Sequence, residues 1–418
     1  MYANLFFDLR GLSTDEIAWI QLLSELMGKL PTEKYTFGDL ENALNSKTGD
    51  FNTSFSWFIK DRSDDQLLPK FKVSSKAMGD KTQEMFELMT EVVTKTKYND
   101  LDRLKELITR HQADVDLRMK QNGLGVARNR LFSYFSNEGV LQEKKGGLEY
   151  YRFITDLSKN FDARKEQIAQ KLSETASAIF NNVNLVAATT CSDEDYVSFE
   201  KALATLTNAL PTTDVTMANW TFEKKKSNEG IQTASKVQYV LQGADYKKLG
   251  YQWNGHLQVL EQLLSTDYLQ TQVRVIGGAY GGFIWFSPSG GMFFGSYRDP
   301  NLKETLDNYK ATPAYLDSLK LDEKALTRFI IGTIANIDQP MTPSQKGERA
   351  FTYYFSGTTK QLKQTERDEI LSTTLDDLKA FKPMIEGILE QNTYCVYGND
   401  EKLKSNQNLF DSLVKLSF

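Results

Sequence analysis

The chain has 418 residues, of which 40% are hydrophobic and 25% are charged, and its formal net charge is −5. This composition is typical of a globular protein with two or three domains, and the acidic balance argues against a nucleic acid or an anionic membrane as partner. Cys191 and Cys395 are the only cysteines, which favours the cytoplasm or another reducing compartment over secretion. The sequence contains neither a signal-peptide pattern nor an apolar run long enough to span a membrane.

The first half of the sequence predicts strands and helices in alternation. We expect strands at 3–9, 50–59, 68–75 and 182–190, and helices at 14–29, 36–46, 193–208 and, several in succession, 79–176. Residues 50–59 and 68–75 alternate and are rich in strand formers, so we expect them to pair. The chain opens directly into its first strand, which fits either a fragment cut at a domain boundary or a subunit that begins abruptly.

A polar segment at 211–234 separates the two halves. It begins at Pro211, lacks apolar periodicity and contains a run of three lysines at 224–226. The lysines are compatible with a binding patch, but a solvated linker is the better interpretation. We therefore predict a first domain at 1–210, a linker at 211–234 and a second domain at 235–418.

The second half repeats the order of elements seen in the first. We expect strands at 236–242, 271–286, 291–298 and 392–397, and helices at 250–266, 301–319, 321–337, 344–356, 366–386 and 401–415. Each half thus runs strand, helix, paired strands, several helices, strand and helix. This order predicts a duplicated α+β fold, each domain having helices on one face of a mostly antiparallel sheet.

A glycine-rich stretch within the predicted strand 271–286 is the most informative part of the sequence. Four of the six residues at 277–282 are glycine, and glycine within a strand marks a bulge or a close approach by another backbone or a ligand. Arg274 and Tyr280 project from one face of an extended strand, roughly 20 Å apart if it is straight and closer if it bulges. A guanidinium fork and a phenol on one face suit a peptide backbone. Equally, the glycines could only form a sheet corner, with Tyr280 packed in a core.

Several motifs together resemble one family of peptidases. The segment Arg274–Gly282 (RVIGGAYGG), followed by Tyr297–Asn301 (YRDPN), is similar to the last domain of presequence proteases, a branch of the insulinase or pitrilysin family of zinc peptidases. The resemblance covers essentially the whole chain in order. It includes further segments near the start, in the helical region and in the second half, at 7–9, 123–136, 146–150 and 343–347.

The resemblance implies a fold, a function and a set of residues. The fold would be two homologous domains of the LuxS/mitochondrial-processing-peptidase type, and the chain would be the carboxy-terminal half of a zinc endopeptidase that degrades unstructured peptides in a closed chamber. Arg274 and Tyr280 match an Arg and a Tyr that contact substrate carbonyls near the scissile bond, where Tyr280 would help to stabilise the tetrahedral intermediate. The backbone of the glycines would line the substrate: Gly277, Gly278, Gly281 and Gly282.

The metal motif of that family, H-x-x-E-H, is missing from this chain. The only histidines are His111 and His256, neither of which begins the motif, and we interpret each as an ordinary surface or packed residue. By element order, the equivalent helix contains Leu22 and Leu26 at the histidine positions and retains only Glu25, which we expect to be a surface carboxylate. We therefore predict no cofactor in this chain and zinc in a partner amino-terminal half.

Three interpretations of the function stay open on the sequence. The first is half of a fused zinc peptidase, inactive alone, that grips peptides while the other half supplies the metal and the general base. The second is a separate zinc-free subunit that pairs with a metal-bearing chain. The third is a scaffold or peptide-binding protein that retains the fold without activity, in which case Arg274 and Tyr280 would be dispensable. No alternative nucleophile or phosphate-binding motif is present.

Overall fold

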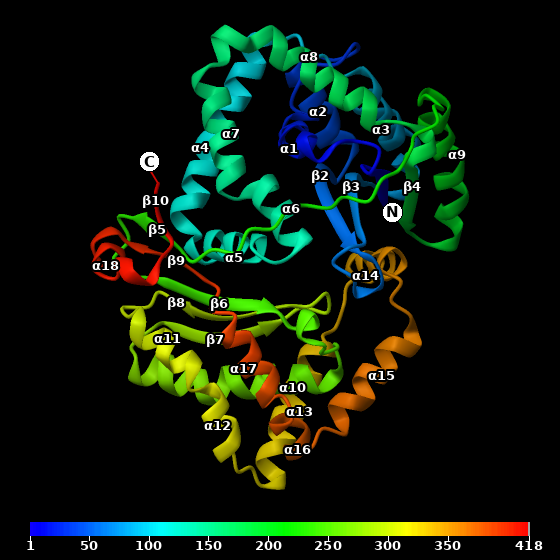
Figure 1. The fold of residues 1–418 in the computed structure, drawn as a ribbon. Helices are drawn as coiled ribbons and strands as arrows, with labels where there is room; N and C mark the ends of the chain where they lie inside the picture. The colour runs from blue at the N-terminus through cyan, green and yellow to red at the C-terminus, as the bar shows by residue number, and fades with distance from the viewer. Residues whose placement is uncertain (417–418) are drawn as a thin grey trace.

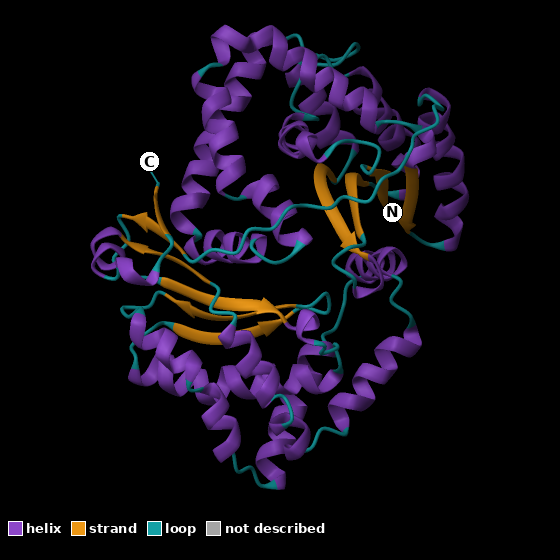
Figure 2. Ribbon diagram, in the orientation of Figure 1, coloured by secondary structure: helices purple, strands orange, loops and turns teal. Residues whose placement is uncertain are grey.

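The computed structural model describes residues 1–416 and consists of two α+β halves, each built on one sheet (Figures 1 and 2). The first sheet has four strands in the order β2-β3-β1-β4, and all of its neighbouring strands are antiparallel. Its strands are β1 (Tyr2–Asp8), β2 (Asp50–Ile59), β3 (Leu67–Lys76) and β4 (Leu185–Thr190). The predicted pairing of 50–59 with 68–75 is confirmed by the ladder between β2 and β3.

Nine α-helices belong to the described residues of this half, and those at 79–176 form the predicted succession (Figure 1). They are α1 (Ile17–Leu26), α2 (Phe37–Lys47), α3 (Thr82–Lys95), α4 (Leu101–Gln121), α5 (Gly123–Ser133), α6 (Asn137–Gly146), α7 (Leu148–Lys159), α8 (Phe161–Ile179) and α9 (Asp193–Ala209). Side-chain oxygens cap several of them; for example, Thr36 accepts from the Asp39 N–H and Ser192 from the Asp195 N–H.

The second sheet has six strands in the order β10-β5-β9-β6-β8-β7. The pairs β10–β5 and β5–β9 are parallel, and the other three pairs are antiparallel. Its strands are β5 (Glu229–Thr233), β6 (Tyr239–Asp245), β7 (Gly281–Phe286), β8 (Gly291–Tyr297), β9 (Tyr394–Asn399) and β10 (Ser412–Lys415). Its helices are α10 (Gly255–Leu263), α11 (Lys303–Lys310), α12 (Thr312–Ser318), α13 (Glu323–Ile337), α14 (Pro343–Ser356), α15 (Lys360–Leu371), α16 (Leu375–Lys379), α17 (Lys382–Glu390) and α18 (Asp400–Ser405).

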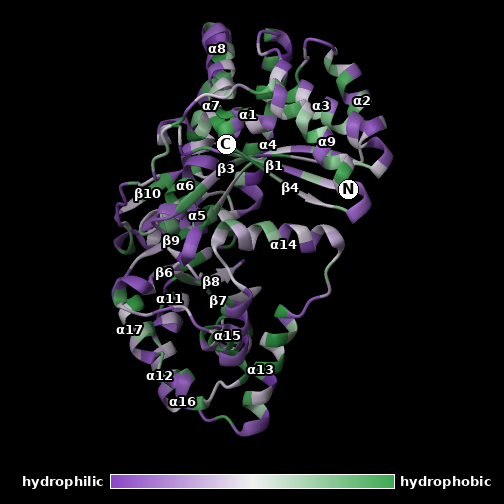
Figure 3. Cartoon of the chain, turned by 90° about the vertical axis from the view of Figure 1, so that its right-hand side faces the viewer, coloured by the Kyte–Doolittle hydropathy of each residue, from purple (hydrophilic) through white to green (hydrophobic). Residues whose placement is uncertain are grey.

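One helix of each half packs against the sheet of the other half. Helix α14 lies beneath the first sheet, against β2 and β4 (Figure 3). There Phe351 and Phe355 meet Phe6 at ring-centroid distances of 4.8 and 5.0 Å. Conversely, α5 packs on β6 and β9, opposite the face of the second sheet that α10, α11 and α17 cover. The alternation along β1 explains the first contact, because Leu5 and Phe7 point into the main core while Phe6 points to α14.

A partly buried ion pair reinforces the junction between the halves. Arg130 of α5 donates Nε–H to Glu229 of β5 at 2.5 Å, and the Tyr134 hydroxyl donates to the same carboxylate at 2.7 Å. Burial alone would raise the pKa of Glu229. The hydrogen bond and charge of Arg130 and the hydrogen bond from Tyr134 outweigh burial, so the pKa of Glu229 lies below its ordinary value. The two halves therefore share a polar interface as well as apolar contacts.

Three expectations about local structure are wrong in part. Residues 270–276, expected at the start of a strand, form a π-helical segment. Residues 229–233, included in the predicted linker, form β5, because the parallel partners β9 and β10 on either side complete its hydrogen bonds. The helix expected at 401–415 ends at Ser405, and Ser412–Lys415 pair with β5 instead.

Within the described residues, no helix is both long and apolar enough to cross a membrane.

Candidate functional site

The glycine-rich stretch is a turn between a helix and an edge strand. Helix α10 continues into two π-helical segments, Leu264–Tyr268 and Gln270–Ile276. The Gly277 and Gly278 N–H groups then donate to the carbonyls of Gln272 (3.0 Å) and Arg274 (2.9 Å), which closes the helix. The Tyr280 N–H donates to the Tyr297 carbonyl at 3.0 Å and begins the pairing of β7 with β8. The chain thus passes from helix to sheet within four residues.

Three of the four glycines are required by the geometry of this turn. Gly278 has φ = +82°, which side chains with a Cβ rarely adopt. A Cβ on Gly277 would lie 2.6 Å from the Val273 carbonyl oxygen, and one on Gly282 would lie 2.7 Å from Cβ of Val273. Gly281 differs, since the nearest atom to its Cβ would be 3.9 Å away. The close approach predicted from the glycines is therefore made, at least in this chain, by its own helix.

The YRDPN segment at 297–301 supports the glycine turn directly. Asn301 donates its Nδ2–H to the Gly277 carbonyl at 2.6 Å. Asp299, which is fully buried, accepts from the Asn301 N–H at 2.8 Å and from the Thr305 hydroxyl at 2.6 Å. Burial raises the pKa of Asp299 against these hydrogen bonds. Sequence reasoning used this segment to recognise the resemblance but assigned Asn301 no role, although its place in the motif was the available signal.

The turn brings Arg274 and Tyr280 together at the surface. The Arg274 guanidinium carbon lies 5.7 Å from the centre of the Tyr280 ring, which is within cation–π range. The expectation that both stand on one strand is wrong, because Arg274 belongs to the π-helical segment and Tyr280 precedes β7. The core alternative for Tyr280 is also wrong, since its side chain is 68% exposed.

The chemistry that this pair can perform is recognition by hydrogen-bond donation. Tyr280 packs against Tyr297, with ring centroids 5.9 Å apart, and most of its side chain stays exposed to solvent. Arg274 offers a planar fork of N–H donors and Tyr280 a hydroxyl, which suit carbonyl or oxyanion acceptors. Val275 and Ile276 beside them are 71% and 70% exposed and add apolar surface.

The helix expected to replace the metal helix is a packed element. Leu22 and Leu26, at the two expected histidine positions of α1, are 0% and 1% exposed. They are not metal ligands, so the residues present do not fit a zinc ion. Glu25, half-buried, accepts from the Gln21 amide at 2.9 Å and lies 3.8 Å from Nδ1 of His111.

Both histidines are engaged with protein hydroxyls. Nε2 of His111 is 2.8 Å from the Tyr150 hydroxyl, and Nδ1 of His256 is 2.9 Å from the Thr373 hydroxyl. Burial lowers the pKa of His111. Across residues 1–416, no three histidine, cysteine, aspartate or glutamate side chains are grouped so that they could hold a metal ion.

Comparisons with known proteins match most of the chain. The family described as associated with peptidase M16, subfamily C, matches residues 1–157, and the "PreP C-terminal domain" matches residues 228–396. Among curated proteins, the protein HypA of Clostridium perfringens is 36% identical over 99% of this chain and 42% of its own length. Presequence protease 1 of Arabidopsis thaliana is 28% identical over 98% of this chain and 38% of its own length. The chain therefore spans about two-fifths of the length of these relatives.

Solved structures share the fold at low sequence identity. The peptidase M16 inactive domain from Pseudomonas fluorescens aligns over 95% of this chain and 92% of that chain, with a TM-score of 0.63 and 16% identity. Pitrilysin aligns over 95% of this chain and 40% of that chain, with a TM-score of 0.60 and 11% identity. The predicted fold class, two α+β units of this architecture, is confirmed by these alignments.

Proposed function

Because the chain belongs to the presequence-protease-like branch of peptidase family M16, as its carboxy-terminal half, we propose that it is the zinc-free half of a zinc endopeptidase. In this proposal, unstructured peptides are degraded in a closed chamber between this half and an amino-terminal half that carries zinc. The partner half supplies the metal and the general base. The coverage of only two-fifths of the curated relatives supports a second half, either in the same polypeptide or as a separate subunit.

The observation that carries the proposal is the exposed Arg274–Tyr280 pair on a rigid turn. The Arg274 guanidinium stacks on the Tyr280 ring, and Asn301 fixes the backbone beneath them, so both donors are preorganised to meet substrate carbonyls. Tyr280 then donates to the oxyanion that develops during peptide hydrolysis, and Arg274 to a neighbouring carbonyl. The backbone at Gly277, Gly278, Gly281 and Gly282 lines this site; Gly281 has the most open space for a ligand.

The domain boundaries and the compartment belong to the same proposal. The predicted boundaries are 1–210 and 235–418; because β5 (Glu229–Thr233) belongs to the second sheet, we place the start of the second domain at β5. A reducing compartment, the cytoplasm or an organelle interior, is supported by the cysteines, since Cys191 and Cys395 are both free thiols and Cys395 is buried.

The test is Tyr280→Phe in the complete enzyme, that is, this half together with its zinc-bearing half. Removal of one oxyanion donor raises the barrier by about 2.7–4 kcal/mol, so we expect kcat to fall by about 10²–10³-fold. The free energy of unfolding should be unchanged, because the hydroxyl of this exposed side chain has no hydrogen-bond partner among the described residues. Tyr354→Phe is the matched control, since Tyr354 is 71% exposed on α14.

Normal turnover by Tyr280→Phe would remove Tyr280 from the site. If peptides also bound equally well to Arg274→Ala and Tyr280→Phe, a scaffold function would replace the proposed one. The isolated chain supplied with zinc should hydrolyse no peptide, and metal-dependent turnover by it would contradict the division of labour between the halves.

A further inference from the structure

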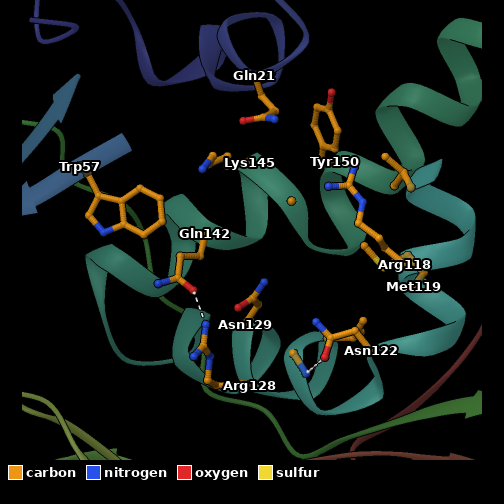
Figure 4. A pocket seen from close by; sticks show the side chains of 14 residues that line it. Gln21, Trp57, Arg118, Met119, Asn122, Arg128, Asn129, Gln142, Lys145 and Tyr150 are labelled. Carbon is orange, nitrogen blue, oxygen red and sulfur yellow. Dashed lines mark hydrogen bonds between the residues drawn. The ribbon is translucent and has the colours of Figure 1, made fainter. Parts of the chain in front are cut away.

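A second polar pocket lies in the first half of the molecule, away from the glycine turn. It is enclosed by α1, α4, α5, α6 and α7 and by the end of β2, and its volume is about 280 Å³ (Figure 4). Three cationic side chains line it, Arg118 of α4, Arg128 of α5 and Lys145 of α6, and no carboxylate among residues 1–416 does. The pocket therefore carries an excess of positive charge although the whole chain is acidic.

Lys145 is the most unusual of these cations. Its Nζ lies 4.9 Å from the centre of the Trp57 ring and 5.6 Å from that of Phe55, so aromatic faces surround its stem and head. Within the described part of the chain it forms no ion pair or hydrogen bond. Burial lowers the pKa of Lys145 to about 8; the charge of Glu25 opposes this, and the charge of Arg118 adds to it. A buried cation without an ionic partner is strongly stabilised when an anion binds next to it.

The other polar groups of the pocket add acceptors. Oε1 of Gln21 and Oδ1 of Asn129 are buried and find no hydrogen-bond partner in the described chain. The Gln21 side chain is itself more than nine-tenths buried, with its amide nitrogen bound to Glu25. Figure 4 places Gln21, Lys145 and Tyr150 on one side of the cavity and Asn129 on the other. Unpaired buried acceptors of this kind call for N–H donors.

A ligand that satisfies both sets of groups must combine an anion with N–H donors. The end of a peptide does so, because its terminal carboxylate is adjacent to backbone N–H groups. An inorganic phosphate would meet the cations but has no N–H donor and no apolar part to offer the pocket. The apolar walls at Trp57, Val115 and Val126 offer contact to the side chain of the last residue.

We propose that this pocket binds the free carboxy terminus of a peptide, with Lys145 and Arg118 as the carboxylate-binding residues. The proposal rests on the proposed function in so far as peptides are the ligands. It adds a second anchoring point, which would hold the end of the peptide while Arg274 and Tyr280 hold its backbone elsewhere.

A continuous set of contacts joins the two sites. Met119 and Asn122 line the pocket, and the Met119 carbonyl accepts from the Tyr397 hydroxyl at 2.9 Å. Tyr397 meets Tyr239 at 5.9 Å between ring centroids, and Tyr239 meets Tyr297 at 5.3 Å. The Tyr297 ring in turn contacts the Tyr280 ring.

The experiment measures binding of short peptides to the 418-residue chain by fluorescence anisotropy. The probe is an N-terminally labelled peptide of alanine and leucine with a free carboxy terminus, compared with the same peptide as its amide. We expect amidation to weaken binding by about tenfold or more, because hydrogen bonds to charged groups are the strong ones. Lys145→Met and Arg118→Gln should weaken binding of the free acid by a similar factor and leave binding of the amide unchanged.

Lys144→Met is the matched control, because Lys144 is the neighbouring lysine on α6 and does not line the pocket. It should bind like the parent chain. Arg118 is exposed, so Arg118→Gln keeps the test valid if Lys145→Met does not fold. Equal binding of acid and amide would overturn the proposal. So would equally tight binding of an amidated peptide with an internal glutamate, or displacement of the free acid by equimolar inorganic phosphate. A loss of turnover in Tyr280→Phe is measured separately, so either proposal can fail alone.

Discussion

The helix α1 and the glycine turn at 277–282 are the two regions in which a catalytic function would be sought, and they have opposite characters. Helix α1 buries Leu22, Leu23 and Leu26 almost completely and serves the core. The glycine turn leaves Val275, Ile276 and Tyr280 about 70% exposed on a backbone that hydrogen bonds hold rigidly. Apolar and aromatic side chains exposed together on a rigid backbone are a feature of binding surfaces. The leucines of α1 need no binding function, because their burial in the core accounts for their presence.

The largest change in the free energy of unfolding should come from a substitution in α1. Leu22→Ala removes a fully buried side chain from α1, and such truncations cost about 2–5 kcal/mol of the free energy of unfolding. Ile276→Ala is the counterpart in the exposed region and should change it by less than about 0.5 kcal/mol. Urea denaturation of both variants measures the difference. Similar losses in the two variants would mean that the glycine turn is covered in solution.

A smaller effect should separate two neighbouring glycines of the turn. In Gly282→Ala the new methyl group meets Val273 and the Leu269 carbonyl, so we expect a loss of about 1–3 kcal/mol. In Gly281→Ala the methyl group meets only Cβ of Tyr297, at an ordinary contact distance of 3.9 Å, and stability should be unchanged or slightly higher. Thermal unfolding distinguishes the two. A tolerated Gly282→Ala would show that the π-helical segment does not pack tightly against β7.

The same turn shows where sequence reasoning succeeded and where it failed. Most strands and helices follow from their periodicity, and the glycines correctly marked a close approach of two backbones. The prediction of a strand at 270–276 was wrong because the β-branched residues of this segment favour a strand locally. Val273 is instead on one face with the buried residues of the preceding turns, Leu264, Tyr268 and Leu269, and joins the core of the second half.

Other parts of the structure depend on contacts that no local pattern carries. Strand β10 pairs with β5 across about 180 residues of sequence, so its helix-like composition was misleading. The exchange of α5 and α14 between the halves, and the cationic pocket formed by α4, α5 and α6, likewise depend on how distant helices pack. Arg274 and Tyr280 could be proposed from the resemblance, but their proximity required the π-helical segment.

A positioning role for Asn301 is the next test of the rigidity of the turn. Asn301→Ala removes the hydrogen bond to the Gly277 carbonyl and should cost about 1 kcal/mol of stability. In the complete enzyme, kcat should fall by more than this loss of folded protein explains, because Tyr280 would be held less firmly. Asn308→Ala, on the neighbouring α11, is the control. Unchanged kcat with reduced stability would make Asn301 a purely structural residue.

A pH-dependent effect concerns Glu261 of α10, the helix that occupies in the second half the place of α1 in the first. Burial raises the pKa of Glu261 to about 7, although its carboxylate accepts from the Phe286 N–H at 3.1 Å and so covers the free edge of β7. Between the ordinary pKa of 4.5 and 7, the folded state binds more protons than the unfolded state, so stability falls as pH rises through this range and is constant above it.

Glu261→Gln removes the titration and retains an acceptor for the Phe286 N–H. We therefore expect the variant to gain stability over the parent chain at about pH 8 and to show little difference at about pH 4.5, as measured by urea denaturation at both values. Glu304→Gln, an exposed carboxylate on α11, controls for the loss of one negative charge. The opposite sign, a variant that is less stable at the higher pH, would mean that the charged carboxylate is needed at the edge of β7. The second half would then retain a polar requirement that the packed helix α1 does not have.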